Sequence, residues 1–329
     1  MKDVVIINNP LMPFIEDLDS LPFPAWDLFP MEKYFTDPRT AVKTGKSEMQ
    51  ILGTRGCPNQ CTFCSSKNEK HQGTRYRMRS PSRIVDEIVY INERYGTEVF
   101  GFSDLAFPLV KSHAEEFCNE LIRRKVNKKI RWVSECRVKS LDAGLLTLMK
   151  RSGCVRVCFG IESGNDNILH SIKKNFTTED IRRAVELVRK GGIDVDGMFM
   201  IGLPGETENM IKETIAFAVD IKVRYAIFNI FAPYPGCELW DSLMKEAKIK
   251  FDSWADFVSY PSFGGGKPVY VPDGITHEKL MILQLYAMRR FYLRPTFIYE
   301  EIKRFKPSHL KKYYHGLKGL LLRKKEGIR

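Results

Sequence analysis

The sequence lacks the patterns of a membrane-spanning or secreted protein. No uninterrupted apolar stretch reaches the ~18 residues that cross a bilayer. The chain does not open on a basic stretch followed by an apolar core. A phosphate-binding loop is also missing, because the glycines at 264–266 are followed by Lys267 and Pro268 without a Lys-Ser or Lys-Thr pair. We therefore expect a cytoplasmic protein that does not bind nucleotides through such a loop.

Cysteine is scarce, since eight residues in a chain of 329 are too few for a disulfide scaffold. The composition, 43% hydrophobic and 28% charged, is that of an ordinary globular protein. The length suffices for one large α/β domain with an appendage. The net charge of +12 indicates a solvated basic face, and an anionic substrate, nucleic acid or an acidic membrane surface would also suit it.

Three of the cysteines lie together in the run Cys57-Pro58-Asn59-Gln60-Cys61-Thr62-Phe63-Cys64. The apolar residues 49–52 and then Gly53-Thr54-Arg55-Gly56 precede it, which is typical of a strand end, a turn and a tight thiolate loop. Zinc needs four ligands, usually as two separated pairs, and the run 57–64 contains only three cysteines and no histidine. Three cysteines instead suit a four-iron, four-sulfur cluster that keeps one iron open for a small molecule.

The spacing Cys-x3-Cys-x2-Cys, with Phe63 before the last cysteine, resembles the signature of the radical S-adenosylmethionine (radical SAM) superfamily. The resemblance implies that Cys57, Cys61 and Cys64 hold a [4Fe-4S] cluster whose free iron binds the amino and carboxylate groups of SAM. In that family the reduced cluster gives one electron to the sulfonium, and a 5′-deoxyadenosyl radical then abstracts hydrogen from the substrate.

A second motif points to the same family. Gly160-Ile161-Glu162-Ser163-Gly164 closes a predicted strand and resembles the superfamily's ribose-binding motif, in which the glutamate accepts hydrogen bonds from ribose hydroxyls. A carboxylate suits a vicinal diol, and flanking glycines let the backbone approach the nucleoside. The resemblance therefore assigns Glu162 and Ser163 to cofactor binding, together with Phe63 of the cysteine motif.

Four further residues are predicted cofactor contacts because they stand at the ends of predicted strands. The resemblance places Asp104 near the methionine amino group, although related sequences carry two adjacent acids where this chain has Leu105. A helix-capping aspartate is the alternative. Arg137 suits the methionine carboxylate as a bidentate partner, and a surface salt bridge is its alternative. Met200 and Gly202 are expected to lie against the adenine.

Other chemically suggestive residues receive structural interpretations. Glu206 is predicted to cap the helix that follows it. Cys154 and Cys158 stand on one predicted strand, on the same face and ~13 Å apart, too far to share an ion. Cys237 occupies the threonine position of a Pro-Gly-Thr sequence common in the family, and a fourth ligand there would close the site that SAM requires. Tyr234 and Cys237 remain candidates for a radical-quenching residue.

Strand-like runs alternate with helical patterns from Met49 onward, which predicts parallel strands with crossover helices. Six strand-helix units within residues 49–248 predict an α/β fold, a partial (β/α)6 TIM-like barrel of the radical SAM type. The third strand is expected over 129–134. One crossover helix is expected to start at a Ser80 cap followed by Pro81, and a later one at Thr177 or Thr178. Residues 1–48 are expected to form an extended arm, because prolines punctuate them. Residues 249–329 are expected to form a mainly helical C-terminal region.

Residues 18–28, Leu-Asp-Ser-Leu-Pro-Phe-Pro-Ala-Trp-Asp-Leu, resemble the connector that joins a cobalamin-binding domain to the radical domain in one branch of the superfamily. The 17 residues before this run are too few for a cobalamin fold. We therefore expect that the chain has lost that domain, is a fragment, or meets the domain on another polypeptide. A separate cobalamin-binding protein is accordingly a candidate partner.

The predicted activity is radical SAM chemistry at the barrel mouth, namely methyl transfer, cyclisation or rearrangement of an organic small molecule or lipid-like substrate. An iron-sulfur electron carrier or redox sensor is the alternative, although it has no use for Glu162. An RNA-modifying enzyme is a third class, but no RNA-binding module is visible, so nucleic acid is not an expected partner.

Two partners other than the substrate follow from this prediction. A flavodoxin or ferredoxin is the expected electron donor. The basic segment towards the C-terminus, in which lysines and arginines alternate with Leu320, Leu321 and Leu322, is interpreted either as a solvated helix or as a peripheral membrane contact.

Overall fold

The computed structural model describes residues 9–31, 48–68, 73–305 and 310–321, and its centre is a curved sheet of six parallel strands. The strands stand in the order β1-β4-β5-β6-β7-β8, so each crossover moves the chain one strand along the sheet. Their bounds are β1 (Glu48–Ile51), β4 (Val99–Phe102), β5 (Arg131–Cys136), β6 (Cys154–Glu162), β7 (Asp194–Ile201) and β8 (Tyr225–Ile230). The predicted α/β partial barrel is confirmed.

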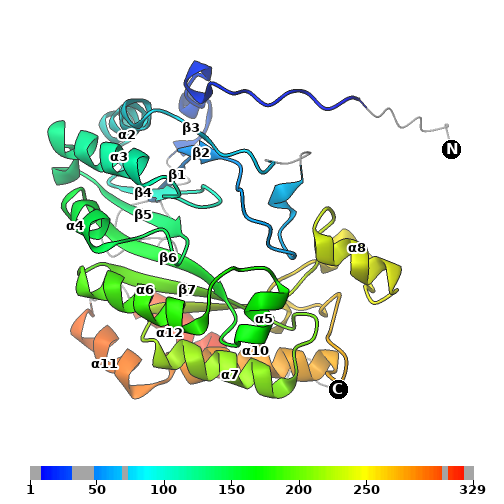
Figure 1. The fold of residues 1–329 in the computed structure, drawn as a ribbon. Coiled ribbons are helices and arrows are strands. Elements are labelled where there is room, and N and C mark those ends of the chain that lie inside the picture. The colour runs from blue at the N-terminus through cyan, green and yellow to red at the C-terminus, as the bar shows by residue number, and fades with distance from the viewer. Residues whose placement is uncertain (1–8, 32–47, 69–72, 306–309, 322–329) are drawn as a thin grey trace.

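Crossover helices cover the outer face of the sheet (Figure 1). They are α2 (Pro81–Tyr95), α3 (Lys111–Arg123), α4 (Ala143–Arg151), α6 (Thr178–Lys190) and α7 (Glu208–Asp220). The main hydrophobic core lies between these helices and the sheet, and Trp132, Phe102, Phe107 and Phe117 form a cluster of edge-to-face and stacked rings within it. The inner face of the sheet is left for polar and functional side chains.

Local sequence signals set the ends of two crossover helices. Ser80 caps α2 by accepting a hydrogen bond from the backbone of Arg83 (3.3 Å), and Pro81 occupies the first helical position. Thr177 opens α6 with a capping box to Asp180. The predicted cap at Ser80 is confirmed, and of the two predicted alternatives, Thr177 and Thr178, the structure shows Thr177.

The strand β5 lies two residues later than the sequence predicts. Its expected range was 129–134, but a 3₁₀ turn, η4 (Val126–Lys128), holds the preceding residues and the strand runs from Arg131 to Cys136. As a consequence Glu135 belongs to the strand instead of the loop after it. Its side chain alternates with the buried Ser134 and Cys136 and therefore lies on the inner face.

An irregularity in β6 corrects the prediction for its two cysteines. The pairing with β5 shifts register between Trp132 and Val133, and the alternation of β6 is interrupted beside Cys154. Cys154 therefore packs in the main core, whereas Cys158 belongs to the opposite face, near the Asp196 and Glu135 carboxylates. The two thiols do not face the same way, because a strand bulge inserts one residue between them.

The described part of the N-terminal arm packs beside β1. It forms two 3₁₀ turns, η1 (Leu18–Ser20) and η2 (Trp26–Leu28). The Asp19 carboxylate accepts hydrogen bonds from the backbone of Ser80 at 3.0 and 3.1 Å, which ties the arm to the start of α2. The antiparallel hairpin β2 (Thr54–Arg55) and β3 (Arg77–Met78) lies next to the arm. The remainder of the arm, residues 1–8 and 32–47, lies outside the described residues.

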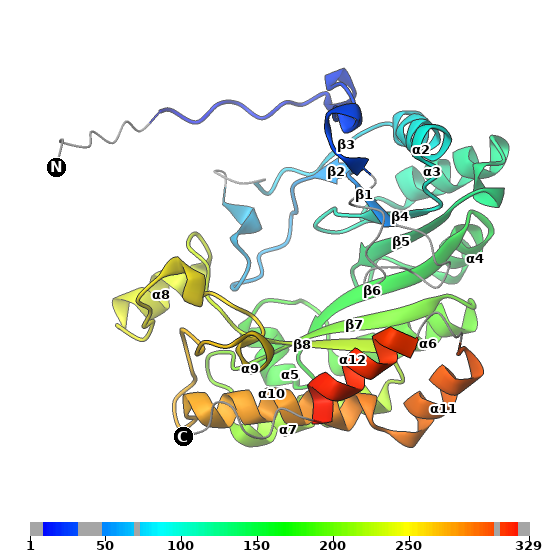
Figure 2. The ribbon, with the colours of Figure 1, turned by 180° about the vertical axis from the view of Figure 1, so that it is seen from behind.

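The C-terminal region is mainly helical and flanks the β8 edge of the sheet (Figure 2). Its elements are α8 (Glu238–Lys245), η5 (Trp254–Asp256), α9 (Pro261–Gly264), α10 (His277–Tyr292), α11 (Pro295–Lys303) and α12 (Leu310–Leu321). In the described parts of the chain, no helix combines the length and apolarity needed to cross a bilayer. The basic residues at 306–309 and 322–329 lie outside the described residues.

Candidate active site

The cysteine loop begins where β1 ends and is held by contacts on both sides. Gly56 has a φ of +84°, and a Cβ there would lie 2.0 Å from the carbonyl oxygen of Arg75, so only glycine fits this turn. The Cys57 backbone donates a hydrogen bond to Gly73 (3.1 Å). The Thr62 backbone donates to Ile172 (3.2 Å) and accepts from Leu239 of α8 (3.0 Å), so the loop is fixed against two other parts of the barrel mouth.

The loop supplies hydrogen-bond donors to its thiols. The Asn59 side-chain amide donates to the sulfur of Cys57 at 3.1 Å, and the Ser66 hydroxyl lies 3.0 Å from the sulfur of Cys64. Cys61 is buried, whereas Cys57 and Cys64 are partly exposed. Donors of this kind stabilise thiolates and tune iron-sulfur centres. The donor set therefore fits the three-cysteine cluster that the sequence predicts.

The side chains of the loop are not gathered around a single point in the described structure. In the described residues, no three His, Cys, Asp or Glu side chains are gathered as they would be around one metal ion. A zinc ion draws its thiolates together at ~2.3 Å each, whereas a four-iron cluster takes one thiolate on each of three irons. The buried Thr62 hydroxyl, which has no hydrogen-bond partner in the described chain, adds a polar atom beside the loop.

A buried lysine, Lys174, joins the cysteine loop to the ribose motif, and the sequence did not single it out. Its ammonium group forms an ion pair with Glu162 at 2.9 Å, with both side chains almost fully buried. The same ammonium lies 5.6 Å from the ring centre of Phe63 and 5.3 Å from that of Phe176, within the range of cation–π attraction. The signal that would have found it is a lysine only twelve residues after a motif glutamate, in a turn between helices.

Arg137 belongs to the same group of side chains. Its guanidinium donates to the backbone oxygen of Lys174 at 3.0 Å and lies 6.0 Å from the ring of Phe176. The predicted alternative for Arg137, a surface salt bridge, is not what the structure shows, because no carboxylate in the described residues pairs with it within 4.0 Å. Two cations and Glu162 therefore stand next to each other at the mouth of the barrel.

The backbone at Glu162 is unusual for a residue with a side chain. Its φ is +67°, and the pairing of β6 with β7 shifts register between Gly160 and Glu162. The carboxylate folds back over Gly160, where a Cβ would come within 2.8 Å of Oε1 of Glu162. A left-handed conformation in a non-glycine residue is costly and is concentrated at functional sites. The strand thus ends by turning this carboxylate inward.

Ser163 supports the motif from behind. Its hydroxyl is fully buried, lies 3.1 Å from the hydroxyl of Thr214 on α7 and accepts from the backbone of Asn165 at 3.2 Å. The Ser163 hydroxyl therefore already has hydrogen-bond partners within the protein, which compete with the predicted contact to the cofactor. The geometry assigns Ser163 to holding the turn after Glu162.

Two acidic residues from neighbouring strands complete the inner wall. Asp104 is buried, and its carboxylate accepts from the backbone of Gly53 (3.0 Å) and from the Thr54 hydroxyl. Burial raises the pKa of Asp104 to about 6. Glu135 is exposed to the barrel interior but closely surrounded by protein; this desolvation, with the charges of Glu162 and Asp104, raises its pKa. Asp104 thus anchors the approach to the cysteine loop, and Glu135 is an interior carboxylate that the sequence missed.

The remaining predicted contacts lie at the end of β7. Met200 and Phe63 pack on the same small apolar cluster, so the structure brings these two predicted residues together. Gly202 has a φ of +83°, and a Cβ there would meet Leu280 of α10 at 2.8 Å. Its backbone N–H already donates a hydrogen bond to the Glu206 carboxylate. The contact of Met200 and Gly202 with adenine stays a prediction.

The prediction that Glu206 caps α7 is wrong, because Thr207 is the N-cap. The Glu206 carboxylate turns back and accepts hydrogen bonds from the backbones of Gly202 (2.6 Å) and Leu203 (2.9 Å). Burial raises its pKa to about 8, and these two hydrogen bonds only partly oppose that shift. Glu206 therefore fixes the turn between β7 and α7.

Cys237 and Tyr234 lie on the segment after β8. The Cys237 thiol is buried and accepts a hydrogen bond from the backbone of Trp240 at 3.3 Å, so it caps α8. Burial raises its pKa. Tyr234 is 44% exposed and close to Phe257. A capping thiol is poorly placed for a fourth cluster ligand, and of the two radical-quenching candidates Tyr234 is the accessible one.

Comparison with known proteins decides the family. The family model described as the radical SAM superfamily matches residues 51–218, which include the cysteine loop, Glu162 and Gly202. The chain belongs to the radical SAM superfamily. Members of this superfamily use a [4Fe-4S] cluster and SAM, in agreement with the residues that the structure gathers at the barrel mouth.

Relatives of this radical SAM chain include methyltransferases and cyclases. An uncharacterized methyltransferase of Pyrococcus horikoshii is 32% identical over 94% of this chain and 64% of its own length. The anaerobic magnesium-protoporphyrin IX monomethyl ester cyclase of Rubrivivax gelatinosus is 28% identical over 90% of this chain and 50% of its own length. The chain thus spans between half and two thirds of these relatives.

A solved structure has the same fold. The radical SAM methyltransferase TsrM from Kitasatospora setae, with cobalamin and a [4Fe-4S] cluster bound, superposes with a TM-score of 0.60 at 18% identity, over 80% of this chain and 52% of TsrM. This chain therefore shares the fold of a cobalamin-bound radical SAM methyltransferase. None of these comparisons supports an electron carrier or redox sensor.

Proposed function

We propose that the chain cleaves SAM reductively at a [4Fe-4S] cluster held by Cys57, Cys61 and Cys64, and that it uses the product for methyl transfer, cyclisation or rearrangement of an organic substrate. When bound, the cluster supplies one electron to the sulfonium, which breaks a carbon-sulfur bond of SAM and yields a 5′-deoxyadenosyl radical. The observation that carries the proposal is the continuous set of side chains from Phe63 through Lys174 to Glu162.

The residues at the mouth complement the parts of SAM. Glu162 presents a carboxylate suited to a ribose diol, with Gly160 leaving space beneath it. Lys174 and Arg137 supply positive charge beside the thiolate loop, which suits a carboxylate group. Glu135 on β5 and Asp104 after the neighbouring β4 supply carboxyl groups, which suit an ammonium group. Apolar contacts from Phe63 and Met200 line the same region.

The reaction type and the partners are proposed from the relatives. A methyltransferase and a ring-forming cyclase both align along most of this chain. The substrate is therefore proposed to be an organic or lipid-like small molecule at the barrel mouth, with a flavodoxin or ferredoxin as electron donor. Cobalamin, which is bound in the TsrM structure, is proposed to reach this chain on a cobalamin-binding protein or segment if the reaction is methyl transfer.

A product assay tests the proposal. The chain is reconstituted with iron and sulfide under anaerobic conditions, then incubated with dithionite and SAM with and without cobalamin. We expect 5′-deoxyadenosine, and S-adenosylhomocysteine in addition only when cobalamin is present and the reaction is methylation. A reconstituted cluster that yields neither product and binds no SAM would contradict the proposal and favour an electron carrier.

A further inference from the structure

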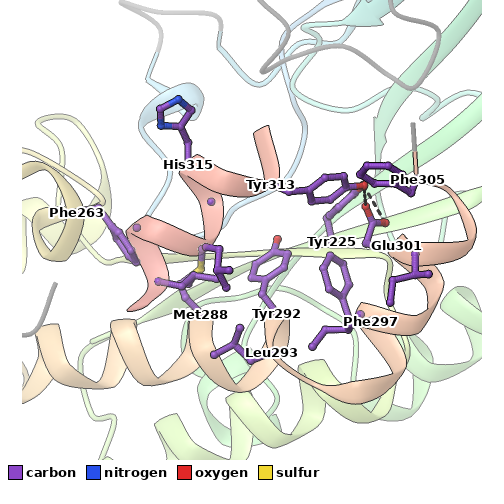
Figure 3. A pocket seen from close by; sticks show the side chains of 16 residues that line it. Tyr225, Phe263, Met288, Tyr292, Leu293, Phe297, Glu301, Phe305, Tyr313 and His315 are labelled. Carbon is purple, nitrogen blue, oxygen red and sulfur yellow. Dashed lines mark hydrogen bonds between the residues drawn. The ribbon is translucent and has the colours of Figure 1, made fainter. Parts of the chain in front are cut away.

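A cavity of about 750 Å³ lies between β8 and the helices α10, α11 and α12, as Figure 3 shows. Its volume falls in the range of ~300–1,000 Å³ that is usual for small-molecule sites. The wall is almost entirely apolar, and Met288, Phe297, Ile302, Phe305 and Leu317 contribute to it. A ligand here would be recognised by its hydrocarbon part.

The cavity is separate from the candidate active site. Tyr225, which lines it, is the first residue of β8, whereas the cysteine loop and Glu162 stand at the carboxyl ends of the strands. None of the predicted cofactor residues lines the cavity. A ligand bound in the cavity would therefore not be the molecule on which the radical chemistry acts.

The Glu301, Tyr313 and Tyr292 polar groups of the wall are paired within the protein. The Glu301 carboxylate accepts hydrogen bonds from the Tyr313 hydroxyl and from the Arg224 guanidinium, both at 2.7 Å. The Tyr292 hydroxyl donates to the backbone oxygen of Ala226 at 2.8 Å. Figure 3 shows the Glu301 carboxylate facing the Tyr313 hydroxyl at one end of the cavity. This pairing leaves the rest of the wall to apolar contact.

Two glycines in α12 make room in the cavity. Gly316 and Gly319 line it, and a Cβ built at either position meets no atom within 4 Å. Glycine in a helix interior costs about 1 kcal/mol relative to alanine. The helix α12 therefore carries two residues of low helix propensity on the side that faces the cavity. Larger side chains at these two positions would occupy the cavity.

The chemistry around the cavity suits an anionic amphiphile. The sequence of α12 contains three lysines and no acidic residue, and Lys318, whose side chain is exposed, stands beside the cavity-lining Leu317 and Gly319 in a chain of net charge +12. Large apolar side chains at the cavity are open to solvent, with Ile302 exposed to 68% and Leu317 to 50%. A helix with exposed apolar residues and lysines is typical of a segment that lies at the surface of an anionic membrane.

We propose that this cavity receives one hydrocarbon chain of an anionic membrane lipid, whose headgroup lies at Lys318 of α12, between the cavity-lining residues Leu317 and Gly319. Burial of several methylene groups in the cavity supplies affinity, and Lys318 together with the basic net charge of the chain selects the anionic headgroup. This site is independent of the proposed radical chemistry, and it would hold the enzyme at a membrane surface.

Sedimentation with lipid vesicles tests the proposal on the full chain. Vesicles of phosphatidylcholine containing phosphatidylglycerol are compared with vesicles of phosphatidylcholine alone. We expect binding to the first and at least tenfold weaker binding to the second, since each lysine near an anionic surface contributes about fivefold. The variant G316L/G319L fills the cavity and should bind the anionic vesicles at least tenfold more weakly. The variant G316A/G319A improves helix propensity in the same way but leaves the space, so it should bind like the original chain.

A second measurement separates the cavity from simple charge attraction. A long-chain polyene fatty acid whose fluorescence rises in apolar surroundings should bind the original chain and G316A/G319A but not G316L/G319L. I302E, which puts a charge at the exposed rim, should also abolish this signal and keep the circular dichroism spectrum. If G316L/G319L binds vesicles and the polyene like the original chain, the proposal is wrong and charge alone attracts the membrane. A lipid-free dimer that G316L/G319L dissociates would overturn it in favour of a second copy of the chain.

Discussion

The ammonium group of Lys174 lies 2.9 Å from Oε1 of Glu162 inside the barrel mouth. Lys174 is only 6% exposed, so both members of the pair have lost most of their hydration. The pair holds the Glu162 carboxylate next to the loop that carries Phe63. We infer that Lys174 positions Glu162 and links the nucleoside end of the site to the cluster end.

Replacing Lys174 by methionine should weaken SAM binding while the cluster still forms. The change leaves the Glu162 carboxylate buried without a partner, which costs ~3–5 kcal/mol in the free energy of unfolding. Anaerobic calorimetry measures SAM binding, and iron and sulfide analysis measures the cluster. K173M is the matched control, because Lys173 forms an ion pair with Glu238 that is about half exposed. Equal SAM affinity in K174M and K173M would show that Lys174 has no part in the site.

The three cysteines proposed to hold the cluster should differ sharply from the other cysteines in their effect on iron loading. C61A is expected to lose the iron-sulfur absorbance and most of the bound iron after reconstitution, because one iron of the cluster loses its thiolate. C158A is the control, since Cys158 stands on β6 away from the loop. Full iron content in C61A would mean that the ligand assignment is wrong.

Two glycines with the same backbone conformation should respond differently to alanine. Gly56 and Gly205 have φ values of +84° and +81°, but a Cβ at Gly56 would overlap the Arg75 carbonyl whereas a Cβ at Gly205 meets nothing within 4 Å. G205A should cost only the ~1–2 kcal/mol of a left-handed alanine. G56A should in addition displace the cysteine loop and reduce iron loading. Thermal unfolding and iron analysis of the two variants check this, and equal iron content would contradict it.

The buried acid Glu206 should make stability depend on pH. Its pKa rises from the usual 4.5 to about 8 on folding, so the folded state holds this proton more tightly than the unfolded state. The contribution of Glu206 to the free energy of unfolding should therefore be greatest at acidic pH. It should fall as the pH rises towards 8. In E206Q the neutral amide keeps the acceptor oxygen for Gly202 and Leu203 and cannot ionise.

Thermal unfolding between pH 6.5 and 8.5 measures the effect of Glu206. We expect the original chain to lose stability over this interval relative to E206Q, because Asp104 and Asp196, whose pKa values are about 6, titrate mainly below it. Parallel stability curves for the two proteins would show that the Glu206 carboxyl is not protonated in the fold.

The sequence predicted the architecture well where one local signal was sufficient. The caps at Ser80 and Thr177 use side chains adjacent to the helices that they start, so the boundaries follow from short-range hydrogen bonds. The sequence prediction was wrong where contacts between residues far apart in the chain determine the local structure. The start of β5 depends on the turn η4 and on pairing with neighbouring strands, and Glu206 turns away from its own helix to the backbone of Gly202.

The sequence by itself determined the family and the parallel α/β fold, because both follow from motif spacing and local periodicity. The spacing of Cys57, Cys61 and Cys64 along one short loop also makes them the proposed cluster ligands. Only the tertiary structure decided that Lys174, Arg137 and Glu135 come to the mouth beside Glu162, and that Ser163 and Cys237 are used by the protein's own turns. The physical reason is that charge pairing and burial depend on residues from other strands. A short-range sequence pattern does not show which of those residues become neighbours in the fold.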